Sequence, residues 1–160
     1  MSMEYNVVVD GSAIDIHTPE GVRYYGGIGI VVMRGNPYPK KELNHSISLN
    51  RECDPWSATA PYCEYTGLYE GVMYVLQHPK VCPEPEEITV YVDSKTALKW
   101  VNGRISKDIK CKPQVDSMNK ELEKLQTSFQ LFFKRKERYH SVAHQTCHGL
   151  ANIASHRFLP

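Results

Sequence analysis

The order of the hydrophobic segments predicts an α/β fold, with a mixed five-stranded sheet and helices on both of its faces. Three apolar or alternating segments come first, as in an antiparallel meander, and segments of helical period then alternate with short apolar runs. The expected order is strand, strand, strand, helix, strand, helix, helix, strand, helix, which joins the meander to βαβ units. A chain of 160 residues with 41% hydrophobic content suits a single domain over residues 1–160.

The first third of the chain predicts three strands, over residues 5–9, 22–33 and 43–49. The first run, YNVVV, is rich in β-branched residues and is followed by Asp10-Gly11-Ser12, a turn or bulge signal. The second run contains the motif GGIG, whose glycines permit the close approach of another backbone. The third run, LNHSISL, alternates apolar and polar residues as a half-buried strand does. The polar join over 14–21 is expected to be exposed.

The rest of the chain predicts four helices and two strands. Leu68, Val72 and Leu76 recur at helical spacing, and Pro79 ends that helix. The run ITVYV is short and continuously apolar, as in a strand buried on both faces. The expected segments, in chain order, are a helix over 62–77, a strand over 88–92, a helix over 95–102, a helix from Pro113 to Leu125, a strand over 129–133, a polar histidine-rich loop over 140–148 and a helix over 150–158.

The composition excludes several classes of protein. No apolar run approaches the roughly 20 residues of a membrane-spanning helix, and the first residues lack the basic and apolar regions of a secretory signal. The five cysteines are widely spaced and form no Cys-x-x-Cys pair, which favours reduced thiols over a disulfide framework. We therefore expect an intracellular monomer, in the cytoplasm or the nucleus, that is not secreted and does not bind a membrane.

The charged residues are unevenly distributed along the chain. Residues 103–139 contain ten Lys or Arg and five Asp or Glu, a net charge of +5, while the remaining residues have a net charge of −4. This division suits a protein that binds a polyanion on its basic side and holds metal-binding carboxylates elsewhere. A solvated helix face with scattered lysines explains the same pattern without any partner.

Three acidic residues stand where α/β proteins place their chemistry. Asp10 is expected to end the first strand, Glu64 to lie in the first turn of the first helix, and Asp93 to end the fourth strand. If the first and fourth strands are neighbours, Asp10 and Asp93 are adjacent, and Glu64 can point at the same spot. Clustered carboxylates repel one another unless cations neutralise them, and hard oxygen ligands select Mg²⁺ or Mn²⁺. Each residue alone also suits an ordinary turn, helix start or N-cap.

Taken in order, these motifs resemble the ribonuclease H type I family, including the domains associated with reverse transcriptases. The matching segments are VVVDGSA (7–13), GGIGIVV (26–32), Thr59 to Glu64, ITVYVDS (88–94) and HGLANIAS (148–155). The resemblance implies the RNase H-like fold and an endonuclease that hydrolyses the RNA strand of RNA–DNA hybrids. It also implies that Asp10, Glu64 and Asp93 bind two Mg²⁺ ions, with Mn²⁺ as a substitute, in a two-metal mechanism.

The last part of the chain departs from the family pattern. The family has a fourth acid on its last helix, and the segment Ala-Asn-Ile-Ala places Asn152 there, as a metal ligand without charge. Alternatively, Asn152 is a passive helix residue and another group, such as His148, completes the site. The family also has a mobile loop histidine, whose expected counterpart is His144, a group that can transfer protons near neutral pH. His140, Cys147 and the two other histidines also permit a zinc interpretation, but their spacing fits no common zinc motif.

Three further residues are expected to bind substrate. Thr59 matches a polar segment with which the family contacts hybrids, although Ala60 and Pro61 replace its amide side chains, and Ser12 and Lys95 are expected to supply substitute backbone contacts. The expected partner is an RNA–DNA hybrid or a related duplex. The alternative function is a catalytically weakened module of the same fold that binds duplex nucleic acid or a protein partner. The losses at positions 60, 61 and 152 favour this alternative, whereas the three acids favour the enzyme.

Overall fold

The computed structural model describes residues 3–34, 41–50, 59–135 and 142–156 of the chain. The elements, in order, are β1 (Glu4–Thr18), β2 (Gly21–Arg34), β3 (Lys41–Asn50), α1 (Ala60–Gln77), β4 (Glu87–Val92), α2 (Lys95–Val101), α3 (Lys112–Leu125), β5 (Gln130–Arg135) and α4 (Val142–His156). This order of strands and helices is the predicted one. None of the helices in these ranges has the length and apolarity that a membrane span requires.

The strands form one mixed sheet in the order β3-β2-β1-β4-β5. β1, β2 and β3 pair antiparallel in succession, which is the predicted meander. β4 pairs in parallel with β1 on one side and with β5 on the other. The first and fourth strands are therefore neighbours, as the hypothesis of a carboxylate cluster requires.

β1 is much longer than the sequence analysis predicts. Its pairing with β2 continues from Tyr5–Arg34 to Thr18–Gly21, so Asp10 lies within the strand and not at its end. The prediction of a turn or bulge at Asp10-Gly11-Ser12 is wrong, because each of these residues has a pairing partner in β2. The predicted join over 14–21 is shorter than expected, since residues 14–18 extend β1, but the segment is exposed or half-exposed as predicted. Gly11 is instead needed for close packing, since a Cβ there would lie 2.6 Å from the backbone nitrogen of Glu64 in α1.

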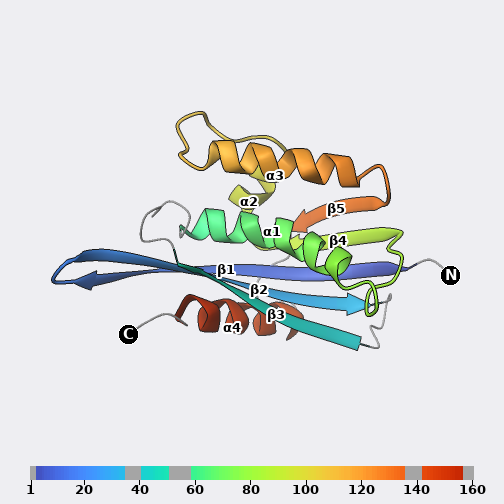
Figure 1. Cartoon of the computed structure of the whole chain (residues 1–160), viewed down its shortest axis with the longest axis horizontal. Helices are drawn as coiled ribbons and strands as arrows, with labels where there is room; N and C mark the ends of the chain where they lie inside the picture. Colours follow the sequence, from blue (N-terminus) through green and yellow to red (C-terminus); the bar gives the residue numbers. More distant parts are fainter. Residues whose placement is uncertain (1–2, 35–40, 51–58, 136–141, 157–160) are drawn as a thin grey trace.

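Helices cover both faces of the sheet, as predicted (Figure 1). On one face, α1 presents Gly67 and Gly71 to Val7, Val9 and Ile28, and this contact forms part of the main hydrophobic core. Small residues on the helix let it approach the β-branched side chains of the sheet closely. Figure 1 shows α2 and α3 on the same side as α1, and α4 on the opposite side of β1 and β2.

On the opposite face, the backbone of α4 lies directly on two glycines of β2. A Cβ on Gly27 would lie 2.3 Å from the carbonyl oxygen of Ala151, and a Cβ on Gly29 would lie 2.0 Å from that of Cys147. The Cys147 thiol donates a hydrogen bond to the carbonyl oxygen of Gly29, with a sulfur–oxygen distance of 2.7 Å. The GGIG motif therefore permits the close backbone approach that its glycines predict.

α4 begins at Val142, so the prediction of a loop over 140–148 and of a helix only from 150 is wrong for the described residues. His140 lies outside them. The face of α4 that packs on the sheet carries small side chains spaced by three and four residues: Ala143, Cys147, Ala151 and Ala154. This stripe has helical period, and it is the packing against β2 that holds the polar histidine-rich segment in a helix.

Part-buried polar contacts link α3 to both α1 and α2. The Tyr65 hydroxyl of α1 donates to Asn119 Oδ1 at 2.6 Å, and the Asn119 amide donates to the carbonyl oxygen of Trp100 at 2.9 Å. Ser94 caps α2 by accepting a hydrogen bond from the Ala97 N–H, and Gly103 follows the helix with φ of +81°. The described cysteines, Cys63, Cys82, Cys111 and Cys147, are free thiols, while Cys53 lies outside the described residues.

Replacing Gly29 with alanine tests the contact between α4 and β2. Because the new methyl group would overlap the α4 backbone, Gly29→Ala is expected to lower the free energy of unfolding by about 2 kcal/mol in equilibrium urea denaturation. Gly149→Ala, on the open side of α4, is the matched control and is expected to raise the free energy of unfolding by about 0.5–1 kcal/mol. Equal effects of the two substitutions would contradict this packing.

Candidate functional site

Two carboxylates meet where β1 and β4 run side by side. The parallel register pairs Val8 with Tyr91, an offset of 83 residues (91 − 8), and the same offset places Asp93 opposite Asp10. Val8 and Tyr91 face α4, and side chains alternate along a strand, so Asp10 and Asp93 project towards the same face. Asp10 is completely buried, and the side chain of Asp93 is 18% exposed.

His144 joins these carboxylates from the first turn of α4. Its ring is completely buried, and its Nε2 lies 3.7 Å from Asp93 Oδ2. One potential ligand atom from each of Asp10, Asp93 and His144 lies within 4.8 Å of the other two. The sequence analysis expects His144 in a mobile loop, and this is wrong because the residue is fixed on a helix that packs against the sheet.

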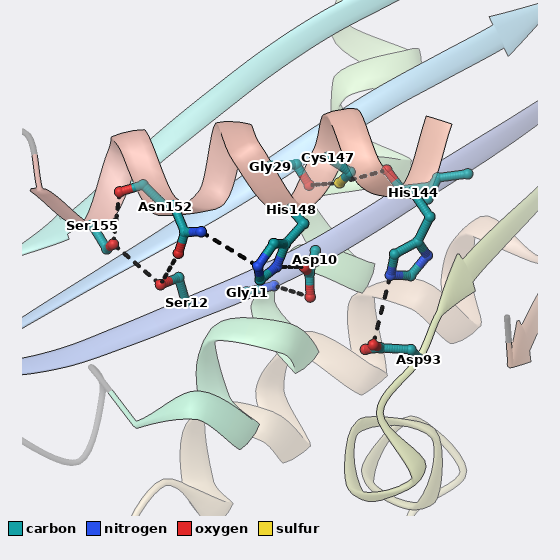
Figure 2. A network of polar contacts seen from close by, with 11 residues as sticks. Asp10, Gly11, Ser12, Gly29, Asp93, His144, Cys147, His148, Asn152 and Ser155 are labelled. Atoms are coloured by element: carbon teal, nitrogen blue, oxygen red, sulfur yellow. Dashed lines mark hydrogen bonds and ion pairs between the residues drawn. The ribbon is translucent and has the colours of Figure 1, made fainter. Parts of the chain in front are cut away.

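His148, one turn further along α4, is the side chain that contacts Asp10 directly. Its Nδ1 donates a hydrogen bond to Asp10 Oδ2 at 2.7 Å, and the backbone N–H of Gly11 donates to Asp10 Oδ1 at 2.9 Å. Figure 2 shows the two imidazoles side by side on α4, with His144 directed at Asp93 and His148 at Asp10. Both oxygens of the buried carboxylate are therefore held in place by donors.

Asn152 is the next member of the same polar chain. Its amide nitrogen lies 3.3 Å from His148 Nε2, and its Oδ1 accepts a hydrogen bond from the Ser12 hydroxyl at 3.0 Å. An amide donor at Nε2 fits a neutral imidazole that carries its proton on Nδ1, which is the tautomer that donates to Asp10. Asn152 thus reaches Asp10 through the His148 ring. Of the two alternatives for the fourth position, this geometry favours His148.

The charge of Asp10 is strongly affected by its surroundings. Burial raises the pKa of its carboxyl above the usual value, the hydrogen bond from His148 opposes this rise, and the nearby charge of Asp93 adds to it. The net direction is upward. In the absence of a cation, the folded protein therefore disfavours the ionised form of Asp10.

The remaining predicted residues lie around this cluster. Glu64 is the fifth residue of α1, past the first turn in which it was predicted, and its backbone packs on Gly11 from the face opposite α4. The cluster of Asp10, Asp93 and His144 does not include it. Thr59 is the exposed N-cap of α1, and Lys95 is exposed at the start of α2. The Ser12 hydroxyl donates a hydrogen bond to Asn152 of α4. Its role in substrate binding stays a prediction.

Two features of the site were missed from the sequence. His144, His148 and Asn152 are spaced by four residues, which places them on one face of a helix and could have predicted α4. Arg135, at the end of β5, donates from Nε to the carbonyl oxygen of Asp93 at 3.4 Å, a contact that depends on the order of the strands. The zinc interpretation fails for Cys147, because its thiol faces the sheet and its pKa is raised by burial.

Comparison with known proteins identifies the fold. No family model matches the sequence, and no curated protein does. Among solved structures, the chain is similar to ribonuclease H1 of the archaeon Halobacterium salinarum, with a TM-score of 0.62 at 18% identity over 94% of this chain and 96% of that one. The chain therefore has the ribonuclease H fold, which confirms the RNase H-like expectation at the level of structure.

Two further structures show the same similarity. One is LC11 ribonuclease H1, isolated from compost and solved in complex with an RNA/DNA hybrid, with a TM-score of 0.65 at 16% identity over 98% of this chain and 99% of that one. The other is the ribonuclease H domain of prototype foamy virus, with a TM-score of 0.64 at 19% identity over 98% and 97% of the two chains. At such identities the similarity describes the fold of this chain.

The raised pKa of Asp10 predicts the pH dependence of stability. The folded pKa lies above the unfolded value of about 3.9, so ionised Asp10 destabilises the metal-free protein once the pH rises past that value. Asp10→Asn is therefore expected to raise the free energy of unfolding at pH 7 in EDTA, with the gain vanishing below the unfolded pKa. Urea denaturation at pH 7 and at a pH below the unfolded pKa measures this difference in stability. The control is Asp15→Asn, at an exposed position on the same strand. A loss of stability at pH 7 would show that the His148 hydrogen bond outweighs burial.

Proposed function

We propose that this chain is a metal-dependent endonuclease that hydrolyses the RNA strand of RNA–DNA hybrids. One observation carries the proposal: on a sheet of ribonuclease H topology, Asp10 and Asp93 converge from neighbouring parallel strands and form a cluster of potential ligands with His144. The similarity to LC11 ribonuclease H1, which was solved with an RNA/DNA hybrid, supports this class of substrate. Because one fold hosts many functions, the argument rests on the site as well as on the fold.

The residues of the site fit a divalent cation. Asp10 is buried beside a second carboxylate, and a buried negative charge is stable only with a compensating partner. Carboxylate oxygens are ligands of Mg²⁺ and Mn²⁺. Asp10 and Asp93 would hold the cation, and we propose Glu64, whose backbone packs against Gly11, as a third acid. A pair of ions at this site is part of the proposal.

The chain's own residues prepare the site for phosphodiester hydrolysis. Bound divalent cations would supply an activated water and stabilise the charge on the leaving oxygen. The Gly11 N–H and the His148 imidazole orient Asp10 from opposite sides, and Asn152 holds His148 in the tautomer that donates. Such fixed donors keep the carboxylate in one geometry, so binding a ligand there needs little rearrangement.

Groups suited to phosphate contacts flank Asp93. Lys95 begins α2 two residues after it, and Arg135 bonds to its backbone carbonyl from the end of β5. Both side chains are exposed, and cationic groups of this kind bind a nucleic-acid backbone without reading its sequence. We also propose that the hydroxyl groups of Thr59 and Ser12 contact the nucleic-acid backbone.

Cleavage of a labelled RNA–DNA hybrid tests the proposed function directly. The wild-type chain is expected to cut the RNA strand in the presence of Mg²⁺ or Mn²⁺ and to leave matched double-stranded RNA and DNA intact. Asp10→Asn is expected to abolish cleavage, because it removes a charged ligand while one amide oxygen remains to accept a hydrogen bond and keep the side chain in place. Asp15→Asn makes the same chemical change on an exposed part of β1 and is expected to cut like wild type. Near wild-type cleavage by Asp10→Asn would refute the assignment of the site.

A second function is favoured by the identity of the residue that contacts Asp10. An imidazole at that position offers no negative charge, so the site holds one carboxylate fewer than the resemblance implies. A catalytically weakened module that binds duplex nucleic acid or a protein partner would tolerate this loss. The two functions differ in whether the wild-type chain turns over hybrid or only retains it.

Restoring a carboxylate distinguishes the two candidates for the fourth position. His148→Asp would place a negative charge beside Asp10, so we expect it to lower the Mg²⁺ concentration needed for half-maximal cleavage. Asn152→Asp, one turn further away, is expected to change that concentration much less. Measuring the cleavage rate against Mg²⁺ concentration for both variants makes the comparison. A larger effect of Asn152→Asp would identify Asn152 as the residue at the fourth ligand position. If His148→Asp cleaves hybrid and the wild-type chain does not, the wild type is the catalytically weakened module.

A further inference from the structure

We infer that His144 is a nitrogen ligand of the cation site, and that it makes the site select first-row transition-metal dications over Mg²⁺. The inference deepens the proposed function, on whose cation site it rests. It replaces the role that the family resemblance implies for this residue, a mobile histidine that transfers protons from a loop. It also divides the work of the two imidazoles, since His148 then acts as a positioning residue for Asp10.

The His144 ring lies in the position of a metal ligand. The residue is completely buried on a helix, and its Nε2 is directed at the Asp93 carboxylate at 3.7 Å. Among the described His, Cys, Asp and Glu side chains, Asp10, Asp93 and His144 form a group of three whose potential ligand atoms all lie within 4.8 Å of one another. A buried imidazole beside two carboxylates is the arrangement of donors expected of a cation site.

The packing of α4 holds the His144 ring in place, so it cannot act as a mobile acid. The neighbouring Ala143 and Cys147 pack on the sheet, and the Cys147 thiol bonds to the carbonyl oxygens of Gly29 and Val8. The α4 backbone touches Gly29 at this same turn. Moving His144 out to a substrate would require this helix to leave the sheet, whereas a metal ligand requires a fixed position.

The chemistry of the donors bears on which cation the site prefers. Mg²⁺ prefers oxygen ligands, whereas imidazole nitrogen suits the later first-row metals, whose affinity rises from Mn²⁺ along the series. A site with two carboxylates and one imidazole is therefore less suited to Mg²⁺ than a site built from carboxylates alone. The carboxylates still provide the charge that holds a dication.

Pulsed EPR of bound Mn²⁺ tests the inference on the intact protein, without nucleic acid. A directly coordinated imidazole produces a ¹⁴N modulation of the Mn²⁺ electron spin echo, and labelling all histidines with ¹⁵N changes its frequencies. We expect this signal in the wild-type chain, and we expect Mg²⁺ to displace Mn²⁺ only in large molar excess. The absence of nitrogen coupling, or displacement by an equimolar amount of Mg²⁺, would overturn the inference.

Three variants assign the signal to one residue. His144→Gln is expected to lose the nitrogen coupling and to bind Mn²⁺ about tenfold more weakly or worse, as loss of a metal-site group does. His148→Gln, one turn along the same helix, and His17→Gln, on the exposed end of β1, are expected to retain the coupling. Should His144→Gln fail to fold, His144→Leu preserves apolar volume at the buried position and gives the same readout. Nitrogen coupling that persists in His144→Gln and disappears in His148→Gln would overturn the assignment.

The spectroscopic result is independent of catalysis. Nitrogen coupling that depends on His144, in a chain that cuts no hybrid, would support this inference and contradict the proposed function. Cleavage of hybrid by a chain whose bound Mn²⁺ shows no nitrogen coupling would do the opposite.

Discussion

The site depends on one packing contact, in which the backbone of α4 lies on the glycines of β2. Gly27 and Gly29 leave room for the carbonyl oxygens of Ala151 and Cys147 at distances that no side chain at either glycine could accommodate. This contact fixes the height and rotation of α4 above the sheet. His144 and His148 project from the same helix, so their positions over Asp93 and Asp10 follow from a constraint made entirely of small residues.

A second constraint is electrostatic. The parallel pairing of β1 and β4 forces two carboxylates together on a buried face, where ionised groups are costly without a partner. Hydrogen-bond donors reduce this cost, because the Gly11 N–H and the His148 imidazole both donate to Asp10. The same donors hold the Asp10 carboxylate in one orientation, on which the proposed cation site relies. Stability and the proposed chemistry therefore draw on the same few atoms.

The chain has the ribonuclease H fold, but its last helix differs from what the sequence resemblance implies. At 16–19% identity to three ribonuclease H structures, the sheet and helices superpose over nearly the whole chain. Asp10 in β1 and Asp93 just after β4 agree with the resemblance. On α4, Asn152 stands at the position of the expected carboxylate, and His144 lies on the helix and not in a mobile loop. On α4, the small residues that pack on β2 and the polar residues that meet Asp10 and Asp93 are different side chains, so one set can change without the other.

The sequence by itself determined the order of the elements, the approximate boundaries of the short strands and helices, and the proximity of Asp10 and Asp93. These features follow from local hydrophobic period, from caps such as Ser94 and from acids at the ends of apolar runs. The full length of β1, the start of α4 and the partner of Asp10 were decided only by the tertiary structure. Each of these depends on a contact between distant segments. β1 pairs with β2, Ala143 and Cys147 are buried on the sheet, and His148 is hydrogen-bonded to Asp10 across 138 residues of sequence. Local patterns describe what a segment prefers, whereas such contacts depend on which other segment reaches it, and that is set by the fold of the whole chain.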